Sequence, residues 1–96
     1  MIHKVIKKPV DVVTETVKKN FEREGFSVLN IENKGEYKTV SKHIKVLVLT
    51  LEKNGKFFKT TLVSNAPDIT ILSAVFPKKM FTQEEEEKIK NLIENL

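Results

Sequence analysis

The chain has 96 residues, of which 40% are hydrophobic and 31% charged, and this predicts a single domain with one hydrophobic core over residues 1–96. It contains no cysteine, which excludes disulfides, thiolate catalysis and cysteine-ligated zinc. The net charge of +4 is uneven, because residues 1–59 carry 13 lysines and arginines against 7 acidic residues, whereas residues 60–96 carry 4 against 6.

The first third of the chain predicts a strand, a helix and a second strand. Residues 2–6 can form a short strand, and Pro9 suits the first turn of a helix because its φ is fixed. Gly25 is typical of the left-handed residue that ends a helix, and the run SVLNI then predicts a strand. The apolar stripe of the helix consists of Val10, Val13, Val17 and Phe21.

The middle of the chain predicts a loop and then a hairpin. Residues 33–42 (NKGEYKTVSK) are typical of a loop, and long loops in compact domains are often functional. The β-rich runs IKVLVLTLEK and KFFKTTLV follow and are joined by Asn54-Gly55. Asn-Gly favours a type I′ turn, because both central residues of that turn need positive φ. The resulting register pairs Lys53 with Lys56 and gathers Leu47, Leu49, Leu51, Phe58 and Leu62 on one face, which we assign to the core.

The last third predicts one more strand and a helix. Residues 65–68 favour a turn, and the β-rich run Ile69–Phe76 ends before Pro77, which cannot continue a central strand. Thr82 and Glu85 have the spacing of a capping box at the start of a helix. The apolar stripe of that helix consists of Ile89, Leu92, Ile93 and Leu96.

The order of these elements is β-α-β-β-β-β-α, which predicts an α+β fold. The economical packing is a mainly antiparallel sheet of about five strands with two helices packed on one face. The run KNFEREGFSVLNIE resembles the helix-glycine-phenylalanine-strand step of many small ferredoxin-like domains. The resemblance implies a fold that is ferredoxin-like in general style, and it indicates no particular family.

The second face of the hairpin is a candidate protein interface. A sheet face that contacts solvent should alternate cleanly between apolar and polar residues, and this one does not. It carries Ile44, Val46, Val48, Phe57 and Val63. β-Branched residues are also good strand formers on a half-solvated face. We favour an interface, and expect a homodimer or contact with another protein, because an apolar patch on a small domain usually marks one.

The basic excess leaves nucleic acid open as an alternative partner. Positive charge beside an aromatic ring is the combination used by grooves that bind single-stranded nucleic acid. Lysines at strand edges also prevent aggregation without binding anything. The candidate contacts are Lys34, Tyr37, Lys38, Lys42 and Lys45 around the 33–45 loop, and Lys53, Lys56 and Lys59 around the 53–59 hairpin tip.

No residue stands out as catalytic, cofactor-binding or metal-ligating. His3 and His43 lack a second histidine at ligand spacing, and helix-start electrostatics explains the run Glu84–Glu87. We therefore expect no cofactor and a non-enzymatic protein, although an active site assembled in space without a sequence motif stays open.

Nothing in the sequence predicts a membrane partner. The longest aliphatic run, Val46 to Leu49, is far too short to span a bilayer. Lysines interrupt the first ten residues, where a signal peptide needs an apolar stretch. We expect a cytoplasmic binding and interaction module that acts as a homodimer, with nucleic-acid binding as the alternative.

Overall fold

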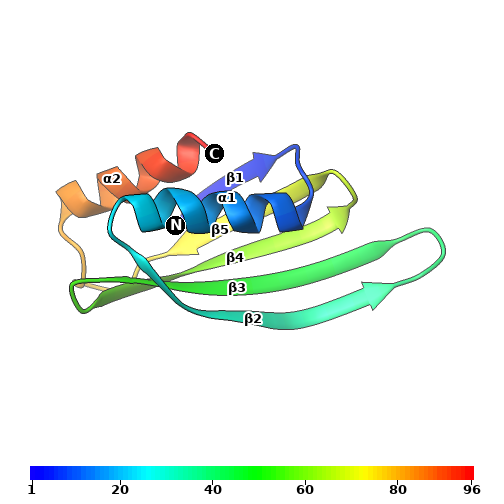
Figure 1. The fold of residues 1–96 in the computed structure, drawn as a ribbon, viewed down its shortest axis with the longest axis horizontal. Helices are drawn as coiled ribbons and strands as arrows, with labels where there is room; N and C mark the ends of the chain where they lie inside the picture. The colour runs from blue at the N-terminus through cyan, green and yellow to red at the C-terminus, as the bar shows by residue number, and fades with distance from the viewer.

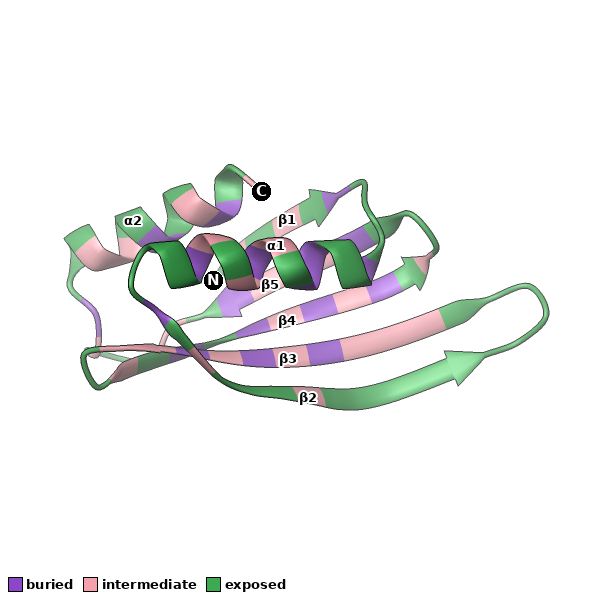
Figure 2. Cartoon of the chain, in the orientation of Figure 1, coloured by how far each residue is buried: buried purple, intermediate pink, exposed green.

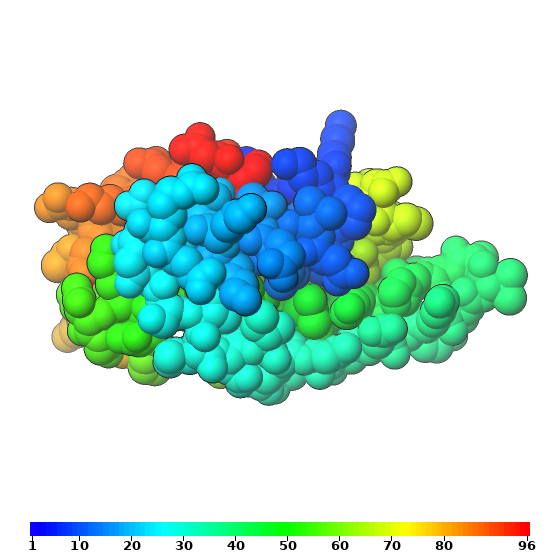
Figure 3. Space-filling model, in the orientation of Figure 1, coloured from blue at the N-terminus to red at the C-terminus, as the bar shows by residue number.

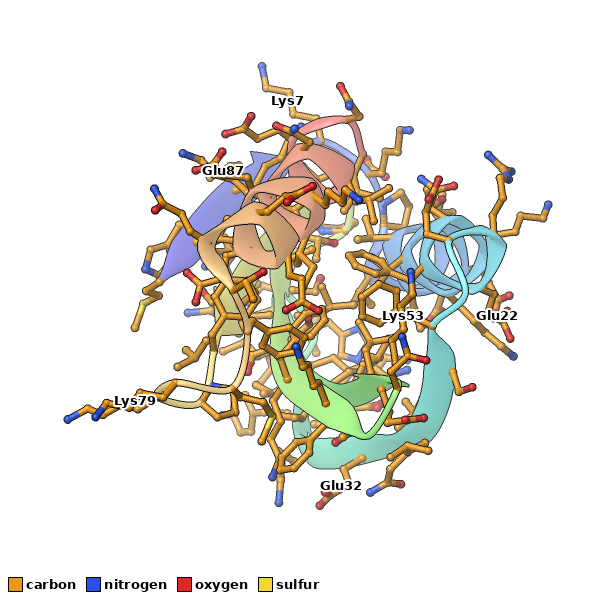
Figure 4. The ribbon with its side chains drawn as sticks, turned by 90° about the vertical axis from the view of Figure 1, so that its left-hand side faces the viewer. Lys7, Glu22, Glu32, Lys53, Lys79 and Glu87 are labelled. Carbon is orange, nitrogen blue, oxygen red and sulfur yellow. The ribbon has the colours of Figure 1, made fainter.

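The computed structural model describes residues 1–96 and has an α+β fold, with a five-stranded antiparallel sheet and two helices (Figure 1). The predicted order β-α-β-β-β-β-α is confirmed. Both helices lie over the same face of the sheet (Figures 1 and 4). The elements are β1 (Ile2–Ile6), α1 (Val10–Arg23), β2 (Ser27–Lys38), β3 (His43–Lys53), β4 (Lys56–Ala66), β5 (Ile69–Val75) and α2 (Gln83–Glu94).

The strand order across the sheet is β1-β5-β4-β3-β2. Strands β2 to β5 form a meander in which each strand pairs with the next one in the chain. β1 pairs with β5, from Ile2 opposite Ala74 to Ile6 opposite Thr70. The first two strands of the chain therefore form opposite edges of the sheet, and α1 carries the chain from one edge to the other.

The turn between β3 and β4 has the predicted geometry. Asn54 has φ 54° and Gly55 has φ 79°, the pair of positive values that a type I′ turn requires. The predicted register is confirmed, with Lys53 opposite Lys56, Leu51 opposite Phe58 and Leu47 opposite Leu62. Because side chains alternate along a strand, this register decides which residues of both strands face the helices.

The core fills the space between the helices and the sheet (Figure 2). Phe21 of α1 and Ile93 of α2 are fully buried there, together with Leu49, Phe58 and Leu62 of the hairpin. The buried leucines and Phe58 confirm that this face of the hairpin belongs to the core, because all of them occupy alternate positions on β3 and β4. Burial of apolar area against water is the main term that stabilises such a layer.

The prediction of a loop over residues 33–42 is wrong. β2 continues to Lys38 and pairs with β3 up to the pair Lys38–His43, so that only residues 39–42 connect the two strands. The register shifts between Asn33 and Gly35, and the Asn33 Oδ1 accepts a hydrogen bond of 3.0 Å from the Gly35 N–H. Asparagine and glycine are typical of turns, but here they form a bulge that an extended strand tolerates.

The end of α1 and the start of α2 are as predicted. Gly25 has φ 90° just after α1, the conformation that a glycine adopts at low cost. At the start of α2, the Glu85 N–H donates to Thr82 Oγ1 (3.1 Å) and the Thr82 N–H donates to Glu85 Oε1 (2.8 Å), so the capping box is confirmed.

The contacts of Glu85 with Lys56 and Thr82 predict how acid destabilises α2. The hydrogen bond from Lys56 and those from Thr82 lower the pKa of Glu85 from 4.5 to about 2. The stability that ionised Glu85 contributes is therefore complete above pH 4.5 and is lost as the pH falls towards 2. We expect Glu85→Gln to reduce the loss of stability across this window, measured by chemical unfolding at a series of pH values. Glu87→Gln removes a charge from the same helix without these contacts and is the control; an equal change in both variants would contradict the assignment.

Candidate functional site: the open face and the β2–β3 arm

The sheet face opposite the helices, called the open face below, carries a continuous apolar row. Val5, Ile71, Val63 and Val46 lie directly opposite one another across β1, β5, β4 and β3. No element of the chain covers them, because both helices lie on the other side (Figure 4). Glu32, labelled in Figure 4, marks the open face at β2.

All five residues of the predicted interface lie on the open face. Val46, Val48 and Phe57 pair with Val63, Thr61 and Glu52, respectively. They alternate along β3 and β4 with the buried residues that face the helices. Phe57 is 40% exposed although its neighbour Phe58 is fully buried. The predicted residues are Ile44, Val46, Val48, Phe57 and Val63.

The open face also includes apolar residues that sequence reasoning missed. Val5, Ile71 and Val75 belong to it, and Tyr37 joins it opposite Ile44. Ile71 and Val75 alternate along β5 with the buried Leu72 and Ala74, which is a readable signal in the sequence. That signal could not place them beside the hairpin, because pairing of β4 with β5 and of β5 with β1 had to be known first.

The β2–β3 hairpin projects beyond the rest of the sheet as an arm, defined here as residues 37–44 (Figure 3). The last residue of β3 that pairs with β4 is Lys45, opposite Ser64, so the arm is a two-stranded ribbon. Its connection closes with a hydrogen bond of 2.7 Å from the Thr39 N–H to the Lys42 carbonyl oxygen. The projection gives the molecule extents of 45 × 22 × 22 Å.

The two sides of the hairpin differ in chemistry beyond the end of the core. On the helix side, Leu47 is the last buried residue of β3, and the next pairs outward are Glu36–Lys45 and Lys38–His43. On the open side, the pairs are Gly35–Val46 and Tyr37–Ile44. The helix side becomes polar where the helices end, as expected for contact with water. The open side stays apolar along the same length.

The predicted nucleic-acid contacts do not form one surface. Lys42 lies in the arm, just before β3. Lys53 is the last residue of β3 and Lys56 lies opposite it, so the length of β3, about 33 Å, separates both from Lys42. Lys53 is on the helix side, where its Nζ donates to the Glu24 carbonyl oxygen (2.8 Å) and lies 5.4 Å from the centre of the Phe26 ring (Figure 4). Lys59 is on the open face, opposite Thr50.

Several of these lysines are already paired with carboxylates. Lys34 Nζ lies 2.8 Å from Glu32, Lys45 Nζ lies 3.5 Å from Asp11, and Lys56 Nζ lies 2.6 Å from Glu85. The hydrogen bond from Lys34 lowers the pKa of Glu32, and that from His43 lowers the pKa of Glu36. Of the other five predicted contacts, Tyr37, Lys38 and Lys42 stand together on the arm, and Lys53 and Lys59 lie away from it.

A cleft of about 480 Å³ lies between the end of α1, the β3–β4 turn and α2. Phe26, Phe81 and Ile89 are among its apolar lining residues, and Glu85 is its carboxylate with a shifted pKa. A lowered pKa makes a carboxylate a weaker base, and the hydrogen bond from Lys56, together with those from Thr82, already accounts for the lowered pKa of Glu85. The shift therefore does not point to Glu85 as a general base.

Comparison with known proteins adds no relationship. No protein-family model, curated protein or solved structure matches the chain. The structure contains no cluster of three or more histidine, aspartate or glutamate side chains that could hold a metal ion. Neither helix combines the length and apolar character needed to cross a membrane.

Proposed function

We propose that this protein is a non-enzymatic binding module that associates with a second copy of itself through the open face. The observation that supports this is the persistence of apolar residues on the open side of the hairpin after the helix side has become polar. Good strand propensity alone favours β-branched residues on both sides of a strand. It does not explain why Ile44 and Tyr37 share one side while Lys38 and His43 share the other.

The dimensions of the open face suit a dimer. Five strands about 4.8 Å apart and averaging about 30 Å in length present about 700 Å², close to the roughly 800 Å² that each partner contributes to a standard interface. A two-fold axis through the row of Val46, Val63 and Ile71 would bring two apolar centres together. Glu32, Glu52 and Lys59 add charges of both signs around that row, so a second copy meets no uniform repulsion.

Sedimentation velocity tests the proposal, with the wild type measured from about 1 μM to high micromolar concentration. We expect a dimer that dissociates on dilution. Val63→Lys should raise its Kd by about a hundredfold or more, since each of two copies loses about 1.5 kcal/mol of valine burial. Val12→Lys, at a valine that is 47% exposed on the outside of α1, is the matched control and should leave the dimer intact.

Two outcomes would count against self-association. A wild type that stays monomeric at high micromolar concentration would leave the open face to a different protein. Equal weakening by Val63→Lys and Val12→Lys would mean that added charge, and not the open face, controls association. Circular dichroism of each variant checks that the fold is unchanged.

Three expectations from the sequence stay predictions. The ferredoxin-like style of the fold rests on the run KNFEREGFSVLNIE. A cytoplasmic location rests on the lack of cysteine. Nucleic-acid binding rests on positive charge. Among the predicted contacts, Lys38 and Lys42 of the arm support it best, because they make no ion pair, unlike Lys34 and Lys45.

A further inference from the structure

The arm has the shape of an inserting element. It is a two-stranded ribbon with no layer packed on it, and Figure 3 shows it standing clear of the rest of the molecule. Its two strands are about 4.8 Å apart, so the ribbon fits the major groove of B-form DNA, which is about 12 Å wide. The deep, narrow major groove of A-form RNA does not admit side chains in this way.

The cations of the arm are available to an anionic partner. Lys38 and Lys42 are exposed and make no ion pair, in contrast to Lys34 and Lys45 at the base of the hairpin. Lys38 lies on the helix side and Lys42 lies in the connection, so neither occupies the apolar open side. The open face and these lysines can therefore contact different partners at the same time.

The tip of the arm carries groups that can reach base edges. Val40 is fully exposed there, between Thr39 and Ser41. An apolar side chain at such a position can contact the methyl group of thymine, and a serine hydroxyl can hydrogen-bond to a base edge or a phosphate. An exposed valine at the end of a ribbon has no role in the core of this protein.

We propose that the β2–β3 arm binds double-stranded DNA by entering its major groove, with Lys38 and Lys42 contacting phosphates and the tip meeting base edges. Affinity in such a contact comes mainly from phosphate neutralisation, which releases counterions. This function goes beyond self-association, because it uses the helix side and the tip of the arm, whereas self-association uses the open side, to which Tyr37 and Ile44 belong.

Fluorescence anisotropy with a labelled duplex DNA of mixed sequence, titrated across salt concentrations, tests the proposal. We expect the wild type to bind at low salt and to weaken steeply as salt rises. The double variant Lys38→Ala/Lys42→Ala should bind at least about tenfold more weakly, with a salt slope smaller by about 1.8, since each phosphate contact contributes about 0.9. Lys88→Ala/Lys90→Ala removes the same charge from α2 and is the control, expected to keep the wild-type slope.

Four results would overturn the proposal. The first is no binding of duplex DNA at low salt. The second is equal weakening by the two double variants, which would indicate general attraction to a basic protein. The third is tighter binding of single-stranded DNA or duplex RNA than of duplex DNA, which contradicts entry into a B-form groove. The fourth is an unchanged affinity of the arm variant. In sedimentation velocity, Lys38→Ala/Lys42→Ala should self-associate as the wild type does. The experiments can therefore reject DNA binding and self-association independently of each other.

Discussion

Replacing Phe58 with alanine is expected to lower the free energy of unfolding by about 3–5 kcal/mol, the cost of removing a large buried aromatic side chain. Phe58 is fully buried on the helix side of β4. Its ring centre lies 5.4–6.0 Å from those of four other phenylalanines, so the variant loses aromatic contacts as well as buried area. The four partners are Phe21, Phe26, Phe76 and Phe81.

The neighbouring Phe57 makes the matched control. It belongs to the same strand and is 40% exposed on the open face, so Phe57→Ala should cost about 1 kcal/mol or less in the monomer. Both variants are compared by urea unfolding at a protein concentration where the wild type is monomeric. A register shifted by one residue would exchange the two faces. Equal losses, or a larger loss for Phe57→Ala, would therefore contradict the pairing of Leu51 with Phe58.

A loss of this size threatens the whole fold. Domains of this kind have unfolding free energies of about 5–15 kcal/mol, so Phe58→Ala removes a large share. The ring joins β4 to the last turn of α1 and to the β5–α2 connection, because Phe21 lies in that turn and Phe81 precedes α2. We therefore expect the unfolding transition to stay cooperative while its midpoint falls.

Local chemistry explains why much of the fold could be predicted from the sequence. Asn54-Gly55 accepts positive φ at both positions, and this decides the register of every pair along the hairpin. Thr82 and Glu85 satisfy each other's backbone donors, and Gly25 ends α1, whatever the rest of the chain does. Such features depend on residues no more than a few positions apart, so one sequence is enough to read them.

The hairpin between β2 and β3 shows where this reasoning fails. The run from Asn33 to Lys42 has the composition of a loop, yet β3 offers an unpaired backbone edge along its full length, from His43 to Lys53. Pairing with that edge satisfies those N–H and C=O groups of residues 33–38 that face β3, and a bulge accommodates the extra residue between Asn33 and Gly35. Tertiary pairing outweighs local composition here, and a single sequence does not reveal it.

The residues of the candidate site also fall into a group that the sequence predicted to lie together correctly and a group that it did not. Ile44, Val46, Val48, Phe57 and Val63 were found together because one hairpin register places them all. The predicted lysine contacts do not come together in the fold, because the length of the strand between Lys42 and Lys53 keeps these two residues apart. Lys42 and Lys53 are close to one hairpin in the sequence, but they occupy opposite ends of β3 in the fold.

Replacing Thr60 with valine is expected to raise the free energy of unfolding by about 1–2 kcal/mol. Thr60 is 1% exposed on the helix side of β4, and its Oγ1 has no hydrogen-bond partner. A buried hydroxyl without a partner costs about 1–3 kcal/mol in protein mutational data. Valine keeps the β-branched shape that the strand and the core accommodate, so it removes this cost without leaving a cavity.

Thr70 separates this effect from general hydrophobicity. It is fully buried on β5, but its Oγ1 donates a hydrogen bond of 2.9 Å to the Lys8 carbonyl oxygen. Thr70→Val removes that donor and should lower the free energy of unfolding by about 1 kcal/mol. Thermal unfolding can resolve the difference, because 1 kcal/mol shifts the Tm of a domain of this size by about 4–8 °C. If both variants raised the Tm, added hydrophobicity would outweigh hydrogen bonding at both sites, and if both lowered it, Thr60 would have a polar partner.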